Sequence, residues 1–288
     1  MGVVPALPGP FPGKGIPPFG PGLAPAHNLA GRLRDQLLTP LVVGSVERAI
    51  LPPVNAIRRQ VGIRPISNAR ELYSAAPLTL YLTAEPLEYP RSDWPDSFRL
   101  VGPISFDPPA PTPQWLDHID QPIVLVTTSS EFQDDGRLIA TALEGLRDEP
   151  VYVVATLPSG DPSRFDIPAN ARVERWLAHS ALLARTACAV THGGMGVTQK
   201  ALVAGVPVVV VPFGRDQLEV ARRVEVSGAG VRLPATKLSP ARLRDAVRAA
   251  RDKGSTAQTL ARQLTAAGGA ASAADEIETL AGRTLSST

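Results

Sequence analysis

Residues 191–198 combine His192 with three glycines at the end of an apolar run. Residues 187–190 before them suit a buried strand, and residues 199–204 after them are strong helix formers. The order predicts a strand, a tight glycine turn and a helix start. The first turn of a helix leaves N–H groups unpaired and carries the positive end of the dipole, so this junction suits an anion such as a phosphate.

A histidine and two glycines after a strand can also be a plain strand-to-helix turn, and the next segment helps to decide. Residues 208–211 form an apolar run of strand length, and residues 212–217 follow as its exit loop. Ligands of open parallel sheets bind beyond the carboxyl ends of the strands, so the two exit loops are expected to face one crevice. Asp216 and Gln217 could bind hydroxyl groups there, or Asp216 could simply cap the following helix.

Together with residues 175–179, the segment 191–230 resembles the donor-binding signature of family 1, UDP-glycosyltransferase-like glycosyltransferases, as found in bacteria. The similarity begins near residues 126–130. Members of this family have the two-domain GT-B fold. The resemblance implies an α/β protein of GT-B type, with one complete Rossmann-like, doubly wound parallel-sheet domain and a partial N-terminal α/β domain.

The resemblance also implies roles for residues of the glycine turn. His192 matches the histidine that hydrogen-bonds the donor diphosphate, and Gly194 and Gly196 match the glycines that open the loop. Val197 stands where many members carry serine or threonine, and Thr198, the next residue, could replace that hydroxyl.

Other residues match contacts at the two ends of the donor. Trp176 corresponds to the residue on which the uracil or thymine ring stacks, although a lone tryptophan is more often part of a core. Leu177 corresponds to the residue whose backbone reads the base edge. Ser130 matches a phosphate contact, with a plain polar strand exit as the alternative, and Asp216 and Gln217 match the pair that holds the sugar hydroxyls.

The sequence departs from the family pattern at two places. Lys200 replaces the glutamate that binds the ribose hydroxyls in many relatives, which puts that contact in doubt, although a lysine suits a diphosphate. Inverting transfer needs a base on the acceptor and positive groups at the leaving diphosphate. The family's basic histidine has no counterpart here, since His27 follows a proline-rich arm, so we expect the base upstream of Met1. The family uses no metal and no cofactor besides its nucleotide-sugar donor.

Composition limits the classes of protein that fit. The 288 residues, 44% of them hydrophobic, are enough for one large or two modest globular domains. A net charge of +2 gives no sign of nucleic-acid binding. The single cysteine, Cys188, excludes an internal disulfide and suits a buried, inert thiol. We see no signal peptide and no transmembrane segment, and we expect a cytoplasmic protein, with peripheral membrane contact left open.

The chain in order predicts the domain organisation. Residues 1–26 hold eight prolines and six glycines, which exclude a packed helix or central strand, and they resemble the acceptor-site loop of some family members. Amphipathic helices over residues 28–61 and two strands follow, too little sheet for a whole domain. We therefore expect a truncated N-terminal acceptor-binding domain at 1–107, a linker at 108–121, the nucleotide-sugar-binding domain at 122–266, and a C-terminal helix at 267–288 that returns to the first domain.

These observations predict a hexosyltransferase that moves a sugar from a UDP- or dTDP-linked donor, with inversion, to a hydroxyl of a lipid or small molecule. The missing base leaves open whether the chain is active alone. The alternative is a non-catalytic or degenerate nucleotide-sugar-binding protein.

Overall fold

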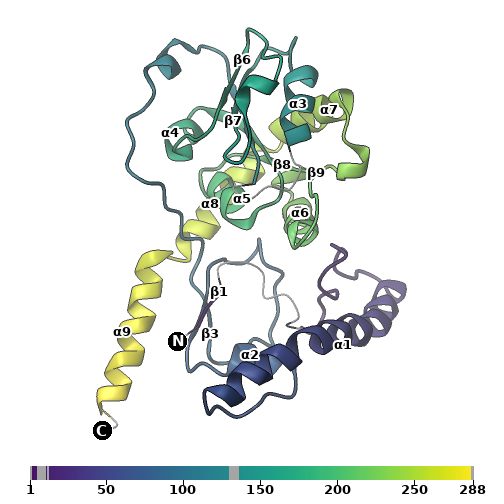
Figure 1. Cartoon of the computed structure of the whole chain (residues 1–288), viewed down its shortest axis with the longest axis vertical. Coiled ribbons are helices and arrows are strands. Elements are labelled where there is room, and N and C mark those ends of the chain that lie inside the picture. The colour runs from purple at the N-terminus through teal and green to yellow at the C-terminus, as the bar shows by residue number, and fades with distance from the viewer. Residues whose placement is uncertain (1, 5–10, 12, 130–135, 287–288) are drawn as a thin grey trace. The chain divides into compact units, whose positions relative to one another are not determined.

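The computed structural model describes residues 2–4, 11, 13–129 and 136–286 (Figure 1). The chain divides into two compact units, one made of Met1–Ile104 with Ala266–Thr288 and the other of Ser105–Thr265. The segment 108–121, predicted as a linker, falls in the second unit and contains a short 3-10 helix, η1 (Gln114–His118).

The described residues of the second unit form a sheet of six parallel strands in the order β6-β5-β4-β7-β8-β9. Chain order runs outward from β4 on one side and from β7 on the other, so the topological switch point lies between β4 and β7. The predicted doubly wound α/β sheet is therefore confirmed. The strands are β4 (Ile123–Thr127), β5 (Tyr152–Thr156), β6 (Ala171–Glu174), β7 (Thr186–Thr191), β8 (Val208–Val210) and β9 (Gly230–Arg232).

Helices cover both faces of this sheet. On one face α3 (Gly136–Gly145) and α7 (Pro240–Arg251) share an apolar core with the strands. α4 (His179–Leu183) packs on β4 and lies on the other side in Figure 1. The central strands β4 and β8 read as nearly unbroken apolar runs because both of their faces are buried. The remaining helices of this unit are α5 (Met195–Val203), α6 (Gln217–Val226), α8 (Gly254–Ala266), η2 (Pro162–Arg164) and η3 (Ala235–Lys237).

The first unit has a smaller sheet. Its described strands are β1 (Gly2–Val4), β2 (Thr79–Tyr81) and β3 (Phe98–Leu100), parallel and in that order. Sequence patterns predicted the second and third but not β1, which is an edge strand within the proline-rich arm. A small apolar cluster joins Leu80 and Val101 to Ala273 of α9 (Ala270–Ser286), so the C-terminal helix packs in this unit.

The helical region after the arm differs from the prediction. It forms one helix, α1 (Leu29–Gln60), which continues through Pro40 and the Pro52–Pro53 pair, and α2 (Ala69–Ser74) follows it. None of the residues of α1, all of which the structure describes, is buried. By length and composition alone α1 could cross a membrane. One helix of this kind is weak evidence for a span, so the expectation of no transmembrane segment stays a prediction.

The proline-rich arm is anchored by an aromatic side chain. Phe11, only 3% exposed, stacks on Phe98 and Trp94 at centroid distances of 5.3 and 5.9 Å. The guanidinium groups of Arg70 and Arg91 lie over its ring at 4.9 and 5.0 Å. Such contacts hold an arm that proline prevents from forming a helix.

Candidate functional site

The carboxyl ends of the strands in the second unit stand in one row. Thr127 of β4 pairs with Thr156 of β5 and with Thr191 of β7. Thr156 in turn pairs with Glu174 of β6, and Thr191 with Val210 of β8. The loops that leave these strands therefore share one edge of the sheet, on either side of the switch point. That edge is where open α/β sheets bind their ligands.

The glycine turn after β7 leads directly into α5. The helix begins at Met195, within the stretch 191–198 in which a helix start was predicted, and Gly194 is its N-cap. Thr198 N donates to Gly194 O at 3.1 Å, which closes the first helical turn. A glycine cap has no side chain to accept from the first N–H groups, so the turn retains the donors that an anion requires.

The three glycines of the turn differ in what an added side chain would contact. Gly193 has φ +95°, and a Cβ there would lie 2.9 Å from Gln217 Cβ. A Cβ on Gly194 would lie 2.6 Å from Nε2 of His192, whose ring covers the cap. A Cβ on Gly196 would meet no described atom within 4 Å. The protein's own packing therefore explains Gly193 and Gly194 but not Gly196.

His192 and Thr198 have different surroundings. His192 is 8% exposed and directly follows Thr191, the last residue of β7, at the start of the glycine turn. Its hydrogen bond to a diphosphate stays a prediction. Thr198 is fully buried, and its hydroxyl lies 3.1 Å from the Thr191 hydroxyl, which also accepts from Gly193 N. Thr198 therefore supports the turn from inside the protein. Its hydroxyl points into the core, so the prediction that it replaces the phosphate-binding hydroxyl missing at half-buried Val197 needs correction. Four residues after the cap, Thr198 faces β7.

The exit loop of β8 is held by Gln217. Its Oε1 accepts from the backbone N–H groups of Phe213 and Gly214 at 2.7 and 3.1 Å, and the residue is 2% exposed. Gln217 thus shapes the loop, and its contact with the sugar hydroxyls stays a prediction. Arg215 adopts φ +55° within the same loop.

Asp216 remains the sugar-binding residue that the geometry favours. It occupies the N-cap position of α6, yet among the described residues its side chain makes no capping hydrogen bond. The simple alternative, that Asp216 is present only to cap the helix, therefore loses its support. The carboxylate is half-buried at the same edge of the sheet as the glycine turn.

The predicted base-stacking residue lies in the exit loop of β6. Trp176 is 52% exposed, which excludes the alternative of a core tryptophan, and Leu177 beside it is half-buried. Ser130 lies outside the described residues. Its neighbour Ser129 is buried, and Ser129 O accepts from the Ser159 hydroxyl at 3.0 Å.

Lys200 has a partner that sequence patterns did not reveal. Its Nζ lies 2.5 Å from Oδ1 of Asp107 and donates to Phe106 O at 3.0 Å. The idea that Lys200 serves a diphosphate is revised accordingly. Burial alone raises the pKa of Asp107, but hydrogen bonds from Lys200 and the Ser180 N–H, with the charge of Lys200, hold it below its ordinary value. Asp107 lies in a proline-rich segment, 93 residues before Lys200. No local sequence pattern there predicts its ion pair with Lys200.

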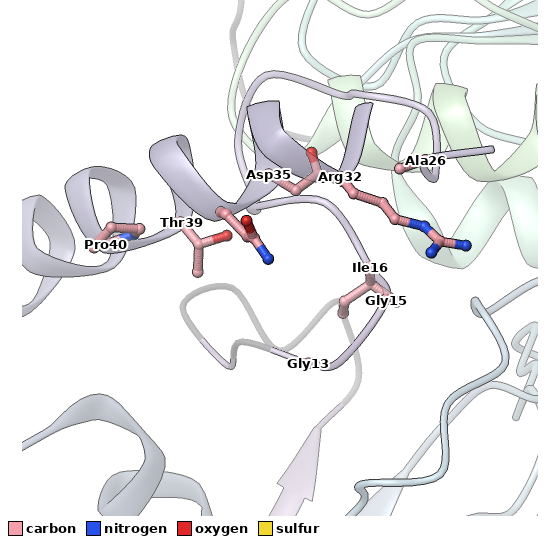
Figure 2. A pocket seen from close by; sticks show the side chains of 9 residues that line it. Gly13, Gly15, Ile16, Ala26, Arg32, Asp35, Thr39 and Pro40 are labelled. Atoms are coloured by element: carbon pink, nitrogen blue, oxygen red, sulfur yellow. The ribbon is translucent and has the colours of Figure 1, made fainter. Parts of the chain in front are cut away.

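The first unit contains a pocket of about 590 Å³ between the arm and α1 (Figure 2). The side chains of Arg32, Asp35 and Thr39 project from the helix on one side, and Ile16 of the arm lies on the other. The lining combines a cation, an anion and hydroxyl and amide groups with apolar surface. The full lining is Gly13, Gly15, Ile16, Ala26, Arg32, Asp35, Gln36, Thr39 and Pro40.

The residues that the structure describes include no group of three His, Cys, Asp or Glu side chains able to hold a metal ion. The expectation that neither metal nor cofactor takes part stays a prediction.

Known proteins resemble this chain in both sequence and fold. Residues 141–279 match the family profile of the erythromycin biosynthesis protein CIII-like C-terminal domain. The 4'-demethylrebeccamycin synthase of Lentzea aerocolonigenes is 39% identical over 250 residues, 84% of this chain and 59% of that protein. The calicheamicin glycosyltransferase CalG4 superposes with a TM-score of 0.67 at 25% identity, over 91% of this chain and 66% of its own. The glycosyltransferase VinC in complex with dTDP superposes with a TM-score of 0.62 at 26% identity, over 72% of this chain and 52% of its own.

These likenesses define an α/β protein of the GT-B type. Within that class, residues 141–279 are similar to the erythromycin biosynthesis protein CIII-like C-terminal domain, and most of the chain is similar to glycosyltransferases of known structure. The chain spans 59% of the length of the rebeccamycin relative and 66% of CalG4. The bacterial source and the missing first part of the N-terminal domain stay predictions.

Proposed function

We propose that this protein transfers a hexose from a UDP- or dTDP-linked donor to a hydroxyl group of a small molecule or lipid, with inversion at the sugar. The observation that carries the proposal is the glycine turn beside the switch point, with exposed Trp176 in another loop of the same edge. A diphosphate on the first turn of α5 and a pyrimidine on the Trp176 ring would use both features.

The proposed chemistry divides between donor and acceptor. The N–H groups of α5, with His192, would stabilise the charge that develops on the departing diphosphate. Asp216 would accept hydrogen bonds from the sugar hydroxyls. The base that removes the acceptor proton is not assigned to a residue of this chain. We place the acceptor in the pocket between the arm and α1, because its mixed polar and apolar lining suits a hydroxylated small molecule (Figure 2).

We further propose that the protein works in the cytoplasm, without a metal ion, and that the exposed apolar residues of α1 allow contact with a membrane surface if the acceptor is a lipid. The alternative of a non-catalytic nucleotide-sugar binder is not favoured, since the relatives are named as a synthase and as glycosyltransferases.

The proposal is tested by binding of UDP, dTDP, UDP-glucose and dTDP-glucose, measured by calorimetry on the whole chain. Asp216→Ala should weaken the sugar nucleotides by about tenfold or more, because hydrogen bonds to a charged group contribute about 1.5–3 kcal/mol each. It should leave the affinity for the nucleoside diphosphates unchanged.

Asp245→Ala, on the outer surface of α7, is the control for a lost carboxylate. Failure of the native chain to bind any of the four compounds would overturn the proposal. Equal weakening of diphosphates and sugar nucleotides by Asp216→Ala would refute the role of Asp216.

A further inference from the structure

The carboxylate of Asp107 joins two elements of the donor site that are distant in sequence. Oδ1 lies 2.5 Å from Lys200 Nζ, on α5, and Oδ2 accepts from the backbone N–H of Ser180, on α4, at 2.9 Å. Both side chains of the ion pair are mostly buried, with 16% exposure for Asp107 and 17% for Lys200. Burial shields such a pair from solvent and salt, so it holds its geometry better than a surface pair.

Asp107 acts as a helix cap supplied from another part of the chain. The N-cap residue of α4 is Ala178, and among the described residues no side chain at that position caps the helix. Ser180 is the second residue of α4, whose N–H is one that an N-cap side chain normally satisfies. The negative charge also suits the positive end of the helix dipole. The start of α4 thus depends on Asp107.

The two elements that Asp107 joins carry the two ends of the proposed ligand site. α4 begins three residues after Trp176, and the intervening chain is too short to move independently of it. α5 carries the glycine turn at its start and Lys200 one and a half turns further on. His179, the first residue of α4, places its Nε2 3.3 Å from the hydroxyl of Thr156 at the row of strand ends. The whole network lies at the ligand edge of the sheet.

We infer that Asp107 and Lys200 are positioning residues for the donor, which hold the Trp176 loop at a fixed distance from the glycine turn of α5. The inference rests on the proposed function. A nucleoside diphosphate contacts both ends of such a site at once, so its affinity depends on the spacing between them, because preorganisation avoids the cost of ordering the loop on binding. A ligand that contacts only the turn does not depend on this spacing.

The test compares two probes, dTDP or UDP, which span the site, and inorganic pyrophosphate, which needs only the turn. Asp107→Asn and Lys200→Met should each weaken nucleoside diphosphate binding by about tenfold, the range seen when a support for a ligand-binding group is removed. Pyrophosphate affinity should change less than about twofold. The double variant should bind no worse than the Asp107 variant alone, since that variant already removes the ion pair with Lys200. Lys200→Arg keeps the positive charge and should retain most of the native affinity for nucleoside diphosphates.

A matched control exists at the opposite edge of the sheet. Glu149 lies 2.6 Å from Arg248, is 13% exposed, and precedes β5 at its amino end. The Arg248 side chain of this pair is 59% exposed. Glu149→Gln therefore removes a short but more exposed ion pair away from the ligand edge, and should not change the affinity for either probe.

Three outcomes would overturn the inference. The first is equal weakening of pyrophosphate and nucleoside diphosphate in the Asp107 and Lys200 variants, which would mean general loss of structure. The second is unchanged nucleoside diphosphate affinity, with binding by the native chain intact, which would leave the proposed function standing. The third is absence of nucleoside diphosphate binding by the native chain, which would remove the proposed function and this inference together.

Discussion

The two units of the chain bury their apolar side chains to very different degrees. In the second unit every residue of β4 and β8 is buried, and Leu243 of α7 has no exposed surface. In the first unit the longest helix, α1, is fully described and has no buried residue, and four leucines spaced four apart along it are exposed. They are Leu29, Leu33, Leu37 and Leu41.

The difference shows how each unit is held together. The second unit is stabilised by an apolar core of its own, so its donor site is positioned by rigid strands and helices. The first unit relies more on polar contacts, such as the two 2.8 Å hydrogen bonds between the Asn55 side chain and the backbone of Ile66, and on the aromatic cluster around Phe11. Stability and donor binding are therefore expected to reside mainly in the second unit.

Truncating one leucine in each unit should show the largest contrast. Leu243→Ala removes a fully buried side chain and should destabilise the protein by about 2–5 kcal/mol, whereas Leu37→Ala, at a site 62% exposed, should stay within about 0.5 kcal/mol. Urea unfolding followed by circular dichroism measures both. Similar losses would show that α1 is packed in solution and would break the comparison.

Tryptophans of the two units should separate binding from stability. Trp176→Ala should weaken UDP and dTDP binding by about 1–3 kcal/mol with little change in melting temperature, because the ring is exposed and stacking on a base has that value. Trp94→Ala should lower stability, since its stacking on Phe11 and Phe98 contributes about 0.5–1.5 kcal/mol per pair, without changing nucleotide affinity. Calorimetry and thermal unfolding give both quantities, and the reverse pattern would exclude Trp176 as the base platform.

Two glycines of one turn sharpen the account within the second unit. Gly194→Ala brings a Cβ to 2.6 Å from the His192 ring and should reduce both stability and nucleotide binding. Gly196→Ala faces open space and should stabilise α5 by up to about 1 kcal/mol, as alanine does relative to glycine in a helix. Its nucleotide affinity should nevertheless fall, because a ligand that approaches Gly196 closely would contact the added methyl. If Gly196→Ala binds nucleotides with unchanged affinity, the phosphates do not bind at this turn.

The smallest effect concerns the single thiol of the second unit. Burial raises the pKa of Cys188 to about 12, so the thiol stays neutral in the folded protein well above its ordinary pKa. The stability that the protein gains by keeping this thiol neutral is fully present below the unfolded pKa near 9, and it is lost as pH rises toward 12. At pH 8 a thiol reagent should label Cys188 only after denaturant is added, and rapid labelling of the native protein would show that the core opens.

Sequence patterns predicted the second unit well because its signals are local. The central strands are short apolar runs, and several junctions carry glycine, proline or a capping residue. One such residue is Ser239, whose side chain accepts from Arg242 N as expected of an N-cap. The helix start at Met195 lies within the predicted stretch 191–198, even though Gly196 and β-branched Val197 disfavour a helix when considered alone. The cap at Gly194 and the packing of α5 on β7 and β8 outweigh that preference.

Contacts between distant segments could not be predicted in the same way. The pairing of Lys200 with Asp107, the anchoring of the arm by Phe11 and the internal role of Thr198 all depend on the folded arrangement. Proline usually breaks a helix, yet α1 continues through Pro40, Pro52 and Pro53. Family resemblance predicted which loops bind the donor, but only the geometry shows that Gln217 is buried within its loop and that Gly194, unlike Gly196, has no room for a side chain.

Hydrogen exchange with and without saturating dTDP or UDP is the most direct test of the central claim, that the donor nucleotide lies at the carboxyl edge of the six-stranded sheet. The account predicts slower exchange in peptides covering residues 174–180 and 191–200, and unchanged exchange in α7 and α1. Protection confined to other segments, or absent altogether at saturating nucleotide, would contradict it.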